Sequence, residues 1–313
     1  MKQRNPFPYS SDNKRYHTFN HYLRTTFHSK VFKVPVDAGF TCPNRDGTCA
    51  STGCSFCSAR GSGDMIIRGT LENQIQEGMK VMRNKWPDGL SMLYFQAYTN
   101  THDTLENLKK LYDPYFEDER FVSISIATRA DCLDDEKIAY FKEKAKQKDL
   151  WFEIGLQSVH ESTNELINRA HPTQLVFDVV KKCHDAGIKV CLHIINGLPY
   201  ESSDMMMETA HQVANSHVDA LKIHMFHVLK HTLEAHRYKK DPYPLLSMEE
   251  FVEIVIDQLE ILPPEMVIER LSGDGLESDL IAPLWTLRKV DLLNHIDKEM
   301  VRRATYQGIK YEK

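Results

Sequence analysis

Residues 42–57 read CPNRDGTCASTGCSFC and hold four of the chain's seven cysteines, Cys42, Cys49, Cys54 and Cys57. Pro, Asn, Asp and Gly stand between them, and these residues break helices and strands. The stretch is therefore predicted to be a ligand-binding loop rather than part of a core. Its final Cys-x2-Cys pair suits a metal or a cluster, because thiolates at this spacing can turn toward one centre.

Two inorganic centres fit the thiols of such a loop. A structural zinc ion takes four ligands, but zinc sites generally pair two short Cys-x2-4-Cys arms, and six residues separate Cys42 from Cys49. A four-iron cluster held by three thiolates leaves one iron without a protein ligand, and that iron can bind a substrate or cofactor directly. The loop alone leaves both centres open.

The composition is that of a globular chain that is not basic as a whole. Its 313 residues are 42% apolar and carry a net charge of −5, so contact with nucleic acid would have to come from local patches. Basic and aromatic residues gather from Lys2 to Lys30 and from Trp285 to Lys313. No apolar run suits a signal peptide or a membrane span, and an odd number of cysteines favours reduced thiols. A cytoplasmic protein without membrane contact is expected.

Outward from the loop, apolar segments that are typical of strands alternate with segments that are typical of helices. The predicted strands are 31–36, 91–98, 121–128, 150–157, 188–195 and 220–227, and the predicted helices are 71–86, 103–115, 135–148, 175–186 and 203–216. This alternation indicates βαβ units and a parallel sheet. Six such strands predict an α/β fold with a partial (β/α)6 TIM-like barrel rather than an open two-faced sheet.

No repeat, low-complexity tract or linker divides the chain. We therefore expect one barrel domain, 31–230, which carries the loop 42–57, with appended ends. The first end is a basic and aromatic extension, 1–30, with a short helix. The second is a C-terminal extension, 231–313, with a loop over 238–244, a helix over 248–261 and a strand over 266–271.

Polar side chains gather at the C-terminal ends of the predicted strands, which is where a parallel barrel places its active site. They are Gln96, Tyr98, Asn100, Thr128, Arg129, Asp131, Glu153, Gln157, His193, Asn196, Lys222, His224, His227 and Arg270. Glu153 stands out, because a carboxylate between apolar neighbours is costly to bury unless it binds something. Asn196-Gly197 and Gly273-Asp274-Gly275 fit a ligand role and a plain turn equally well, and the histidines fit a polar barrel interior better than a metal site.

The segment AGFTCPNRDG (38–47) followed by GCSFC (53–57) resembles the radical S-adenosylmethionine (radical SAM) superfamily. More narrowly, it resembles the YtqA/YhcC subgroup, which is related to the radical SAM domain of the Elongator catalytic subunit. The resemblance extends through IGLQS (154–158), GLP (197–199) and SGD (272–274). It implies an enzyme with a [4Fe-4S] cluster that cleaves S-adenosylmethionine (SAM) to a 5′-deoxyadenosyl radical inside a partial TIM-like barrel.

The resemblance also implies roles for single residues. The common Cys-x3-Cys-x2-Cys spacing is absent, so Cys54 and Cys57 combine with either Cys42 or Cys49, and the long gap after Cys-Pro in the subgroup favours Cys42. Phe56 matches an aromatic position whose backbone neighbours adenine. The other implied SAM contacts are Gln96, Tyr98, Asn100, Thr128, Glu153, Gln157, His193, Asn196, Gly197 and Leu198, although residues 96–101 depart from the usual Gly-Gly-Glu.

The subgroup resemblance implies a transfer RNA substrate. The expected reaction takes the wobble nucleoside 5-carboxymethylaminomethyl-2-thiouridine toward 5-aminomethyl-2-thiouridine. The enzyme would receive electrons from a donor such as flavodoxin or ferredoxin, and a downstream methylase would act on the product. Arg129, Lys222 and Arg270 are candidate partners of the carboxymethyl anion by position. The alternatives are a radical SAM enzyme for another RNA or a small metabolite, and a zinc-stabilised RNA-binding protein.

Overall fold

The computed structural model describes residues 5–273 and 275–312, and its internal contacts divide the chain into two compact units. Unit 1 comprises Met1–Tyr22, Leu156–Ile167 and Leu192–Lys313, and unit 2 comprises Leu23–Gly155 and Asn168–Cys191. Residues 1–4, Asp274 and Lys313, which belong to segments singled out in the sequence, lie outside the described ranges.

Unit 2 is built around parallel strands. β1 (Val31–Val36), β2 (Leu90–Phe95), β3 (Phe121–Thr128) and β4 (Asp149–Gln157) pair in this order, and β5 (Lys189–Asn196) follows β4. Most of their side chains are buried and apolar, as in a parallel sheet that is covered on both faces. The bounds predicted for β1 and β3 are confirmed. β4 and β5 contribute residues to both units.

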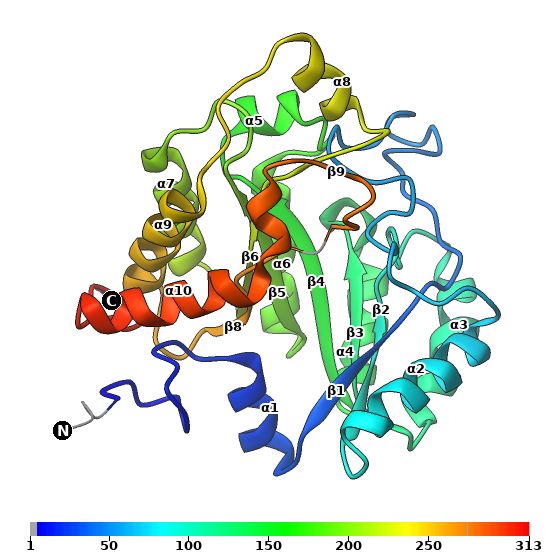
Figure 1. Cartoon of the computed structure of the whole chain (residues 1–313). Coiled ribbons are helices and arrows are strands. Elements are labelled where there is room, and N and C mark those ends of the chain that lie inside the picture. The colour runs from blue at the N-terminus through cyan, green and yellow to red at the C-terminus, as the bar shows by residue number, and fades with distance from the viewer. Residues whose placement is uncertain (1–4, 274, 313) are drawn as a thin grey trace. The chain divides into compact units, whose positions relative to one another are not determined.

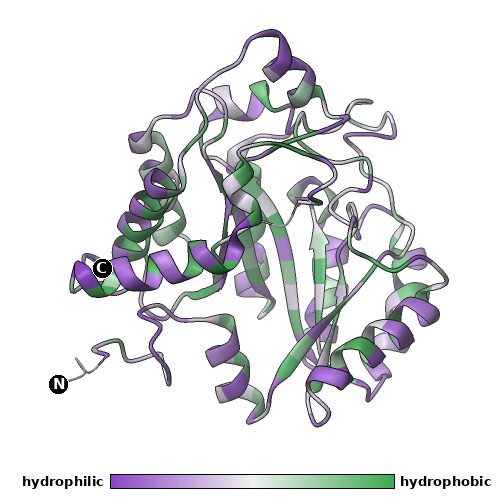
Figure 2. Cartoon of the chain, in the orientation of Figure 1, coloured by the Kyte–Doolittle hydropathy of each residue, from purple (hydrophilic) through white to green (hydrophobic). Residues whose placement is uncertain are grey.

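Helices alternate with the strands of unit 2 (Figure 1). They are α2 (Leu71–Lys85), α3 (Leu105–Glu117), α4 (Asp135–Ala145) and α6 (Thr173–Asp185), with a 3-10 turn over Ala130–Cys132. Thr70, Thr104 and Asp134 cap the first three by accepting a backbone N–H from the first turn, which explains why these helices begin where they do. Green and purple residues alternate along α2 in Figure 2, and its buried Ile75 and Met79 face the core beside β1.

Unit 1 contains the last strands and helices of the chain. β6 (Ala220–Met225) follows β5 and pairs in parallel with β8 (Val267–Arg270), and β7 (Val228–Leu229) pairs antiparallel with β9 (Leu280–Ala282). Its helices are α5 (Glu161–Leu166), α7 (Ser203–Ala214), α8 (Leu233–Lys240), α9 (Met248–Ile261) and α10 (Lys289–Arg302), with a 3-10 turn over Leu284–Leu287. α9 packs against α7 and α10, and a capping box at Ser247 and Glu250 fixes its start.

The structure confirms two of three expectations about the ends of the chain and corrects the other one. The strand predicted over 266–271 is a further strand of the parallel sheet, because β8 pairs with β6. The loop predicted over 238–244 is wrong for its first residues, because Thr232 caps a helix that continues to Lys240. A short helix was predicted in 1–30, and α1 (Phe19–Phe27) supplies it. Among the described residues, no helix has the length and apolar character needed to cross a membrane.

Candidate active site

The cysteine loop follows β1 and folds back on itself through backbone hydrogen bonds. The N–H groups of Arg45 and Asp46 donate to the Cys42 carbonyl at 2.7 and 3.1 Å, and the Cys57 N–H donates to the Cys54 carbonyl at 3.1 Å. The Gly53 N–H donates to the Asn44 carbonyl at 2.6 Å. This last bond brings the segment that ends in Cys54 and Cys57 back beside the segment that begins with Cys42.

Side chains also hold the loop. The buried Asn44 donates through Nδ2 to the Asn168 carbonyl at 2.6 Å, and Asn168 donates back to the Gly53 carbonyl at 2.8 Å. Arg45 donates to the carbonyls of Cys57 and Ser58 at 2.8 and 2.6 Å. The cysteines are all free thiols. The loop is therefore shaped by its backbone and amide groups, and its sulfur atoms remain available as ligands.

The four thiols of the loop influence one another electrostatically. Burial raises the pKa of Cys54, Arg129 partly offsets this, and Cys42 raises it further. Burial raises the pKa of Cys57 to about 12, and Cys54 adds to the effect. Asn44 Nδ2 lies 3.5 Å from the Cys54 sulfur, which is the kind of N–H donor that stabilises a cluster thiolate. The donor set therefore fits a three-thiolate cluster on Cys42, Cys54 and Cys57.

Cys49 has a different environment. It is exposed, and its sulfur lies 3.9 Å from Asp131 Oδ2. Desolvation and then this carboxylate raise the pKa of the Cys49 thiol. Across residues 5–273 and 275–312, no three His, Cys, Asp or Glu side chains meet closely enough to bind a single metal ion. The thiolates of a four-iron cluster bind different irons, so they do not need such a close approach.

A labelling experiment tests this difference between the thiols. In iron-loaded protein under anaerobic conditions, iodoacetamide is expected to alkylate Cys49 first, because Cys132, Cys183 and Cys191 are buried and the other three thiols would be ligands. Peptide mass spectrometry identifies the modified cysteine. The Cys49→Ser variant is the control and should lose the fast phase of labelling. Fast labelling of Cys42 in its place would overturn the ligand assignment.

The strand-end residues of unit 2 hold the neighbouring loops. Gln96 Nε2 donates to the Ser62 carbonyl at 2.7 Å, and the Tyr98 hydroxyl donates to the Ala59 carbonyl at 2.5 Å. The buried Asn100 donates to the carbonyls of Phe95, Ala97 and Ala127. The Thr128 hydroxyl lies 2.5 Å from that of Thr101. Of these four side chains, all predicted as SAM contacts, Gln96 and Tyr98 hold the segment that follows the cysteine loop, and Asn100 and Thr128 join the ends of β2 and β3.

Glu153 has partners that the sequence did not reveal. Its Oε1 accepts from Lys33 Nζ at 2.8 Å and from Ser125 Oγ at 2.7 Å, and its Oε2 accepts from the Tyr94 hydroxyl at 2.7 Å. The Lys33 ammonium also lies 4.7 Å from the centre of the Tyr94 ring. The carboxylate is fully buried, and these protein groups compensate its charge. Its burial therefore does not require a ligand.

Arg129 is already engaged in an ion pair. Its Nε and one terminal nitrogen donate to the two oxygens of Asp131 at 2.9 and 2.7 Å, and the other terminal nitrogen donates to the Arg169 carbonyl at 2.9 Å. Burial lowers the pKa of Arg129, but the hydrogen bonds and charge of Asp131 outweigh it, and the pKa is raised overall. The guanidinium also lowers the pKa of Cys54, so Arg129 lies near the cysteine loop.

Sequence reasoning missed a second contact to the loop. His102 Nε2 lies 2.9 Å from Asp46 Oδ2, and His102 Nδ1 lies 3.8 Å from the Cys132 sulfur. Asp46 belongs to the loop and His102 follows β2, so this pair fastens the loop to the sheet. The only signal in the sequence was the position of His102 just past a predicted strand end.

Phe56 lies in the cysteine loop of unit 2, and the other remaining predicted residues lie in unit 1. Asn196 exchanges hydrogen bonds with Gln258 at 2.8 and 3.0 Å, and Leu198 is buried. Gly197 has a φ of +81°, and a Cβ there would lie 2.9 Å from Leu246, so only glycine fits this turn. Gln157 has a φ of +65°, which is unusual for a residue with a side chain and often marks a functional position.

A cationic group lies on β5, β6 and β8 of unit 1. Lys222 and Arg270 are register partners on β6 and β8, and Lys222 Nζ lies 3.3 Å from Glu269. The His193 and His224 rings are 5.4 Å apart. The pKa of His224 is lowered well below its usual value. Burial is the largest cause of this pKa shift, and the charges that add to it come from His193, Arg270 and Lys222.

Comparison with known proteins gives the family. The Radical SAM superfamily model matches residues 42–213, and the Radical_SAM C-terminal domain model matches residues 218–302. The protein YtqA of Bacillus subtilis (strain 168) is 49% identical over 310 residues, which covers 98% of this chain and 96% of YtqA. A tRNA uridine(34) acetyltransferase of Methanocaldococcus jannaschii is 24% identical over 174 residues, covering 55% of this chain and 31% of that protein.

A solved structure supports the fold. The archaeal Elp3 of Methanocaldococcus infernus superposes with a TM-score of 0.66 at 18% identity and covers 89% of this chain and 64% of its own. The predicted α/β fold with a partial TIM-like barrel is confirmed. The chain therefore belongs to the radical SAM superfamily, within the YtqA/YhcC subgroup, and its cofactors are a [4Fe-4S] cluster and S-adenosylmethionine.

Proposed function

We propose that this radical SAM enzyme acts on transfer RNA and converts 5-carboxymethylaminomethyl-2-thiouridine at the wobble position to 5-aminomethyl-2-thiouridine. The similarity to a tRNA uridine(34) acetyltransferase supports an RNA substrate. The observation that carries the choice of reaction is the cationic group of Lys222 and Arg270 around the histidines of β5 and β6, because it suits an anionic substituent. Glu269 is the carboxylate that pairs with Lys222, and it holds the ammonium group in place.

In this function, the cluster and SAM are bound by the residues that match the family's motifs. Cys42, Cys54 and Cys57 hold the cluster, and the backbone at Phe56 and along 96–101 lies beside SAM, with Gln157, His193, Asn196, Gly197 and Leu198 as further contacts. Gln96, Tyr98, Asn100, Thr128 and Glu153 then act mainly through the loops that their side chains hold. Arg129 contributes positive charge near the thiols while Asp131 fixes its position.

The proposed reaction takes one electron from a reduced flavodoxin or ferredoxin to cleave SAM, and the substrate radical returns one electron to the oxidised carrier. When bound, the cluster and SAM supply a carbon radical that can remove one hydrogen atom from a C–H bond. The hydrogen leaves from the carbon between the amine and the carboxylate of the substrate. Loss of one electron and one proton then gives a C=N bond, and water adds across it. The C–N bond breaks to release the aminomethyl uridine and glyoxylate. Lys222 and Arg270 hold the carboxylate throughout.

Reconstitution tests the function directly. Purified enzyme with its cluster, SAM and a reductant is incubated with tRNA that carries the carboxymethylaminomethyl group, and nucleosides are measured by mass spectrometry. We expect that nucleoside to fall as the aminomethyl nucleoside and glyoxylate rise, and Lys222→Met to retain SAM cleavage while slowing turnover about 10-fold or more. Formation of 5′-deoxyadenosine with unchanged tRNA would exclude this substrate. A colourless, zinc-loaded protein would instead support the RNA-binding alternative.

A further inference from the structure

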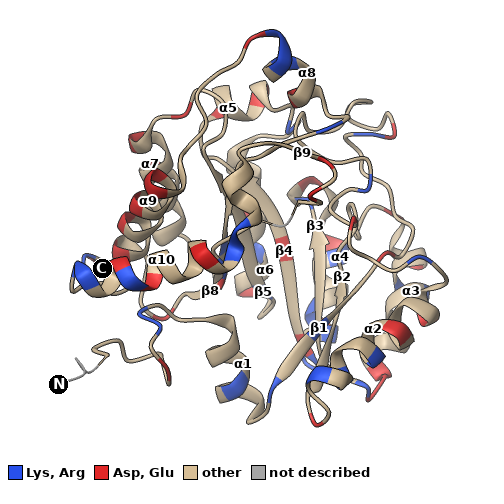
Figure 3. Cartoon of the chain, viewed as in Figure 1, with Lys and Arg blue, Asp and Glu red and all other residues tan. Residues whose placement is uncertain are grey.

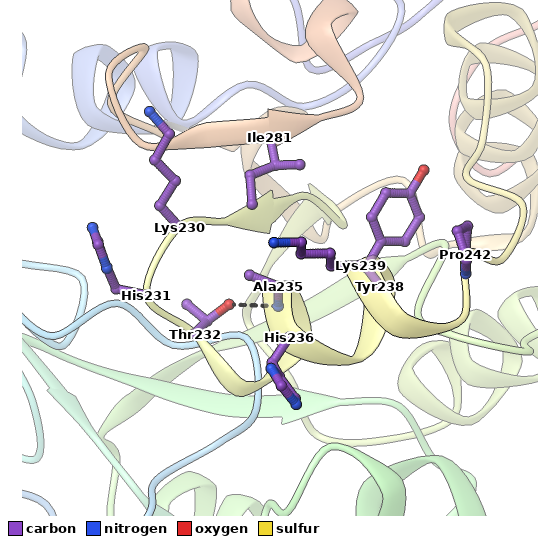
Figure 4. A pocket seen from close by; sticks show the side chains of 9 residues that line it. All are labelled: Lys230, His231, Thr232, Ala235, His236, Tyr238, Lys239, Pro242 and Ile281. Carbon is purple, nitrogen blue, oxygen red and sulfur yellow. Dashed lines mark hydrogen bonds between the residues drawn. The ribbon is translucent and has the colours of Figure 1, made fainter.

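A groove lies beside α8 in unit 1, and its lining includes none of the residues assigned to the reaction (Figure 4). Its volume is about 560 Å³, and it is lined by Lys230, His231, Thr232, Ala235, His236, Tyr238, Lys239, Pro242 and Ile281. We call it the α8 groove. Its size falls within the range of sites that bind small molecules, roughly 300–1,000 Å³.

The frame of the α8 groove is well fixed. The Lys230 N–H donates to the Asp279 carbonyl at 2.7 Å, which continues the pairing of β7 with β9. Thr232 Oγ1 accepts from the Ala235 N–H at 3.0 Å and caps α8. Beneath the helix, the buried Glu234 accepts from Arg237 at 2.8 Å and from the Tyr243 hydroxyl at 2.6 Å. These contacts hold the groove in shape without a ligand.

The charge of the α8 groove is positive. Its lining contains two lysines and two histidines and no aspartate or glutamate. The last turn of α8 carries Arg237, Lys239 and Lys240, which appear as a blue patch in Figure 3. Glu234, the nearest acid on the helix, is buried and paired with Arg237. Within the part of the chain that the structure describes, Lys239 and Lys240 form no ion pair. Their charges are therefore available to an anion.

The wall of the α8 groove is apolar and partly aromatic. Tyr238, Pro242 and Ile281 face the space in Figure 4, and Ile281 is 39% exposed. The Tyr238 ring packs against Tyr243 with 5.2 Å between ring centres at an angle of 79°. A fixed aromatic ring beside unpaired ammonium groups is the arrangement by which proteins hold single-stranded nucleotides, since the base stacks and the phosphate pairs with cations.

We propose that the α8 groove binds an unpaired nucleotide of the RNA substrate. The base lies against Tyr238, Pro242 and Ile281, and the flanking phosphates meet Lys239 and Lys240. The inference rests on the proposed function for the identity of the RNA, and it adds a binding site that shares no residue with the reaction. It also explains how a chain with a net charge of −5 could bind a polyanion, because the binding charge is local.

Charge reversal tests the α8 groove. The double variant Lys239→Glu/Lys240→Glu is compared with Lys181→Glu/Lys182→Glu, which makes the same charge change at exposed lysines of α6. Binding of iron-loaded enzyme to tRNA is measured by fluorescence anisotropy over a series of salt concentrations. We expect the α8 variant to bind about 10-fold more weakly or worse, with a slope of log K against log salt smaller by roughly two. The α6 variant should match the wild type.

A second variant separates stacking from charge. Tyr238→Leu keeps an apolar side chain against Tyr243 but removes the flat ring. It should weaken binding by about 5- to 100-fold without changing the salt slope. SAM cleavage in the absence of RNA should be unchanged in every variant, which confirms that the fold and cluster are intact.

The outcomes distinguish this inference from the proposed function. Equal tRNA affinity of the α8 and α6 variants would overturn the inference, and a peptide or a small ligand would then be the occupant to test in the groove. The proposed function would not be affected, because tRNA modification by the wild type is measured separately. Loss of tRNA binding in the α8 variants alone would support the groove even if the wild type left the wobble nucleoside unchanged. If the wild-type enzyme modifies tRNA but its tRNA affinity does not depend on Lys239 and Lys240, only the proposed nucleotide site in the α8 groove is refuted.

Discussion

Alanine in place of Cys42, Cys54 or Cys57 is expected to abolish iron binding and SAM cleavage, whereas Cys49→Ala should retain about four irons per chain. Three thiolates hold such a cluster, so the loss of one leaves two irons without protein ligands. Cys49 is exposed and lies beside Asp131, whereas Cys42, Cys54 and Cys57 are half-buried. Iron and sulfide analysis, visible absorbance and the electron paramagnetic resonance spectrum of reduced protein measure the result.

The controls for this series come from the same chain. Cys183→Ala removes a buried thiol of α6 outside the loop and should keep both iron and SAM cleavage. Iron loss in Cys49→Ala together with retention in Cys42→Ala would reverse the ligand choice. Full iron content in all the single variants would show that the cluster lies elsewhere.

Lys33→Met is expected to lower the free energy of unfolding by about 3 kcal/mol. The substitution keeps the volume and apolar stem of the lysine but removes the ammonium group 2.8 Å from the fully buried carboxylate of Glu153. Tyr94 and Ser125 continue to donate hydrogen bonds, but neither carries a positive charge. Denaturation in urea, followed by circular dichroism, measures the change.

A double variant identifies the cause of this loss. Lys33→Met/Glu153→Gln removes both charges while the amide retains partners in Tyr94 and Ser125, so it should recover most of the stability. Lys80→Met on the exposed side of α2 is the matched control and should change stability by less than about 0.5 kcal/mol. A double variant as unstable as the single one would show that packing, not charge, makes Lys33 important.

The elements nearest to the sheet were the easiest to predict. β1 and β3 have the predicted bounds because their alternating or continuous apolar residues are buried along their whole length. β2 ends at Phe95, before the predicted Tyr98, because Tyr98 takes a φ of +60° to reach the Ala59 carbonyl. Helix α8 was missed because its sequence is mostly polar. It is stabilised by the Thr232 cap and by the buried Glu234, which only the tertiary structure reveals.

The candidate site could be predicted in outline but not in its contacts. The resemblance carried by residues 38–47 and 53–57, and by the motifs at later strand ends, indicated the correct family. The partner of Glu153 could not be predicted, since Lys33 is 120 residues away in the sequence. For the same reason, the bond between Asn44 and the carbonyl of Asn168, 124 residues further along, gave no sequence signal. Distant pairs of this kind depend on the finished sheet, whereas motifs depend on local spacing.

The bond between Asn44 and Asn168 has a consequence for how the enzyme acquires and keeps its iron. A loop without internal contacts would have to be ordered by the metal, at a cost of about 1–2 kcal/mol for each residue fixed. Here Asn44, Asn168 and Arg45 order the loop as part of folding, so cluster insertion bears little of this entropic cost. We therefore expect a cluster destroyed by oxygen to be rebuilt on the folded chain, without unfolding of the protein.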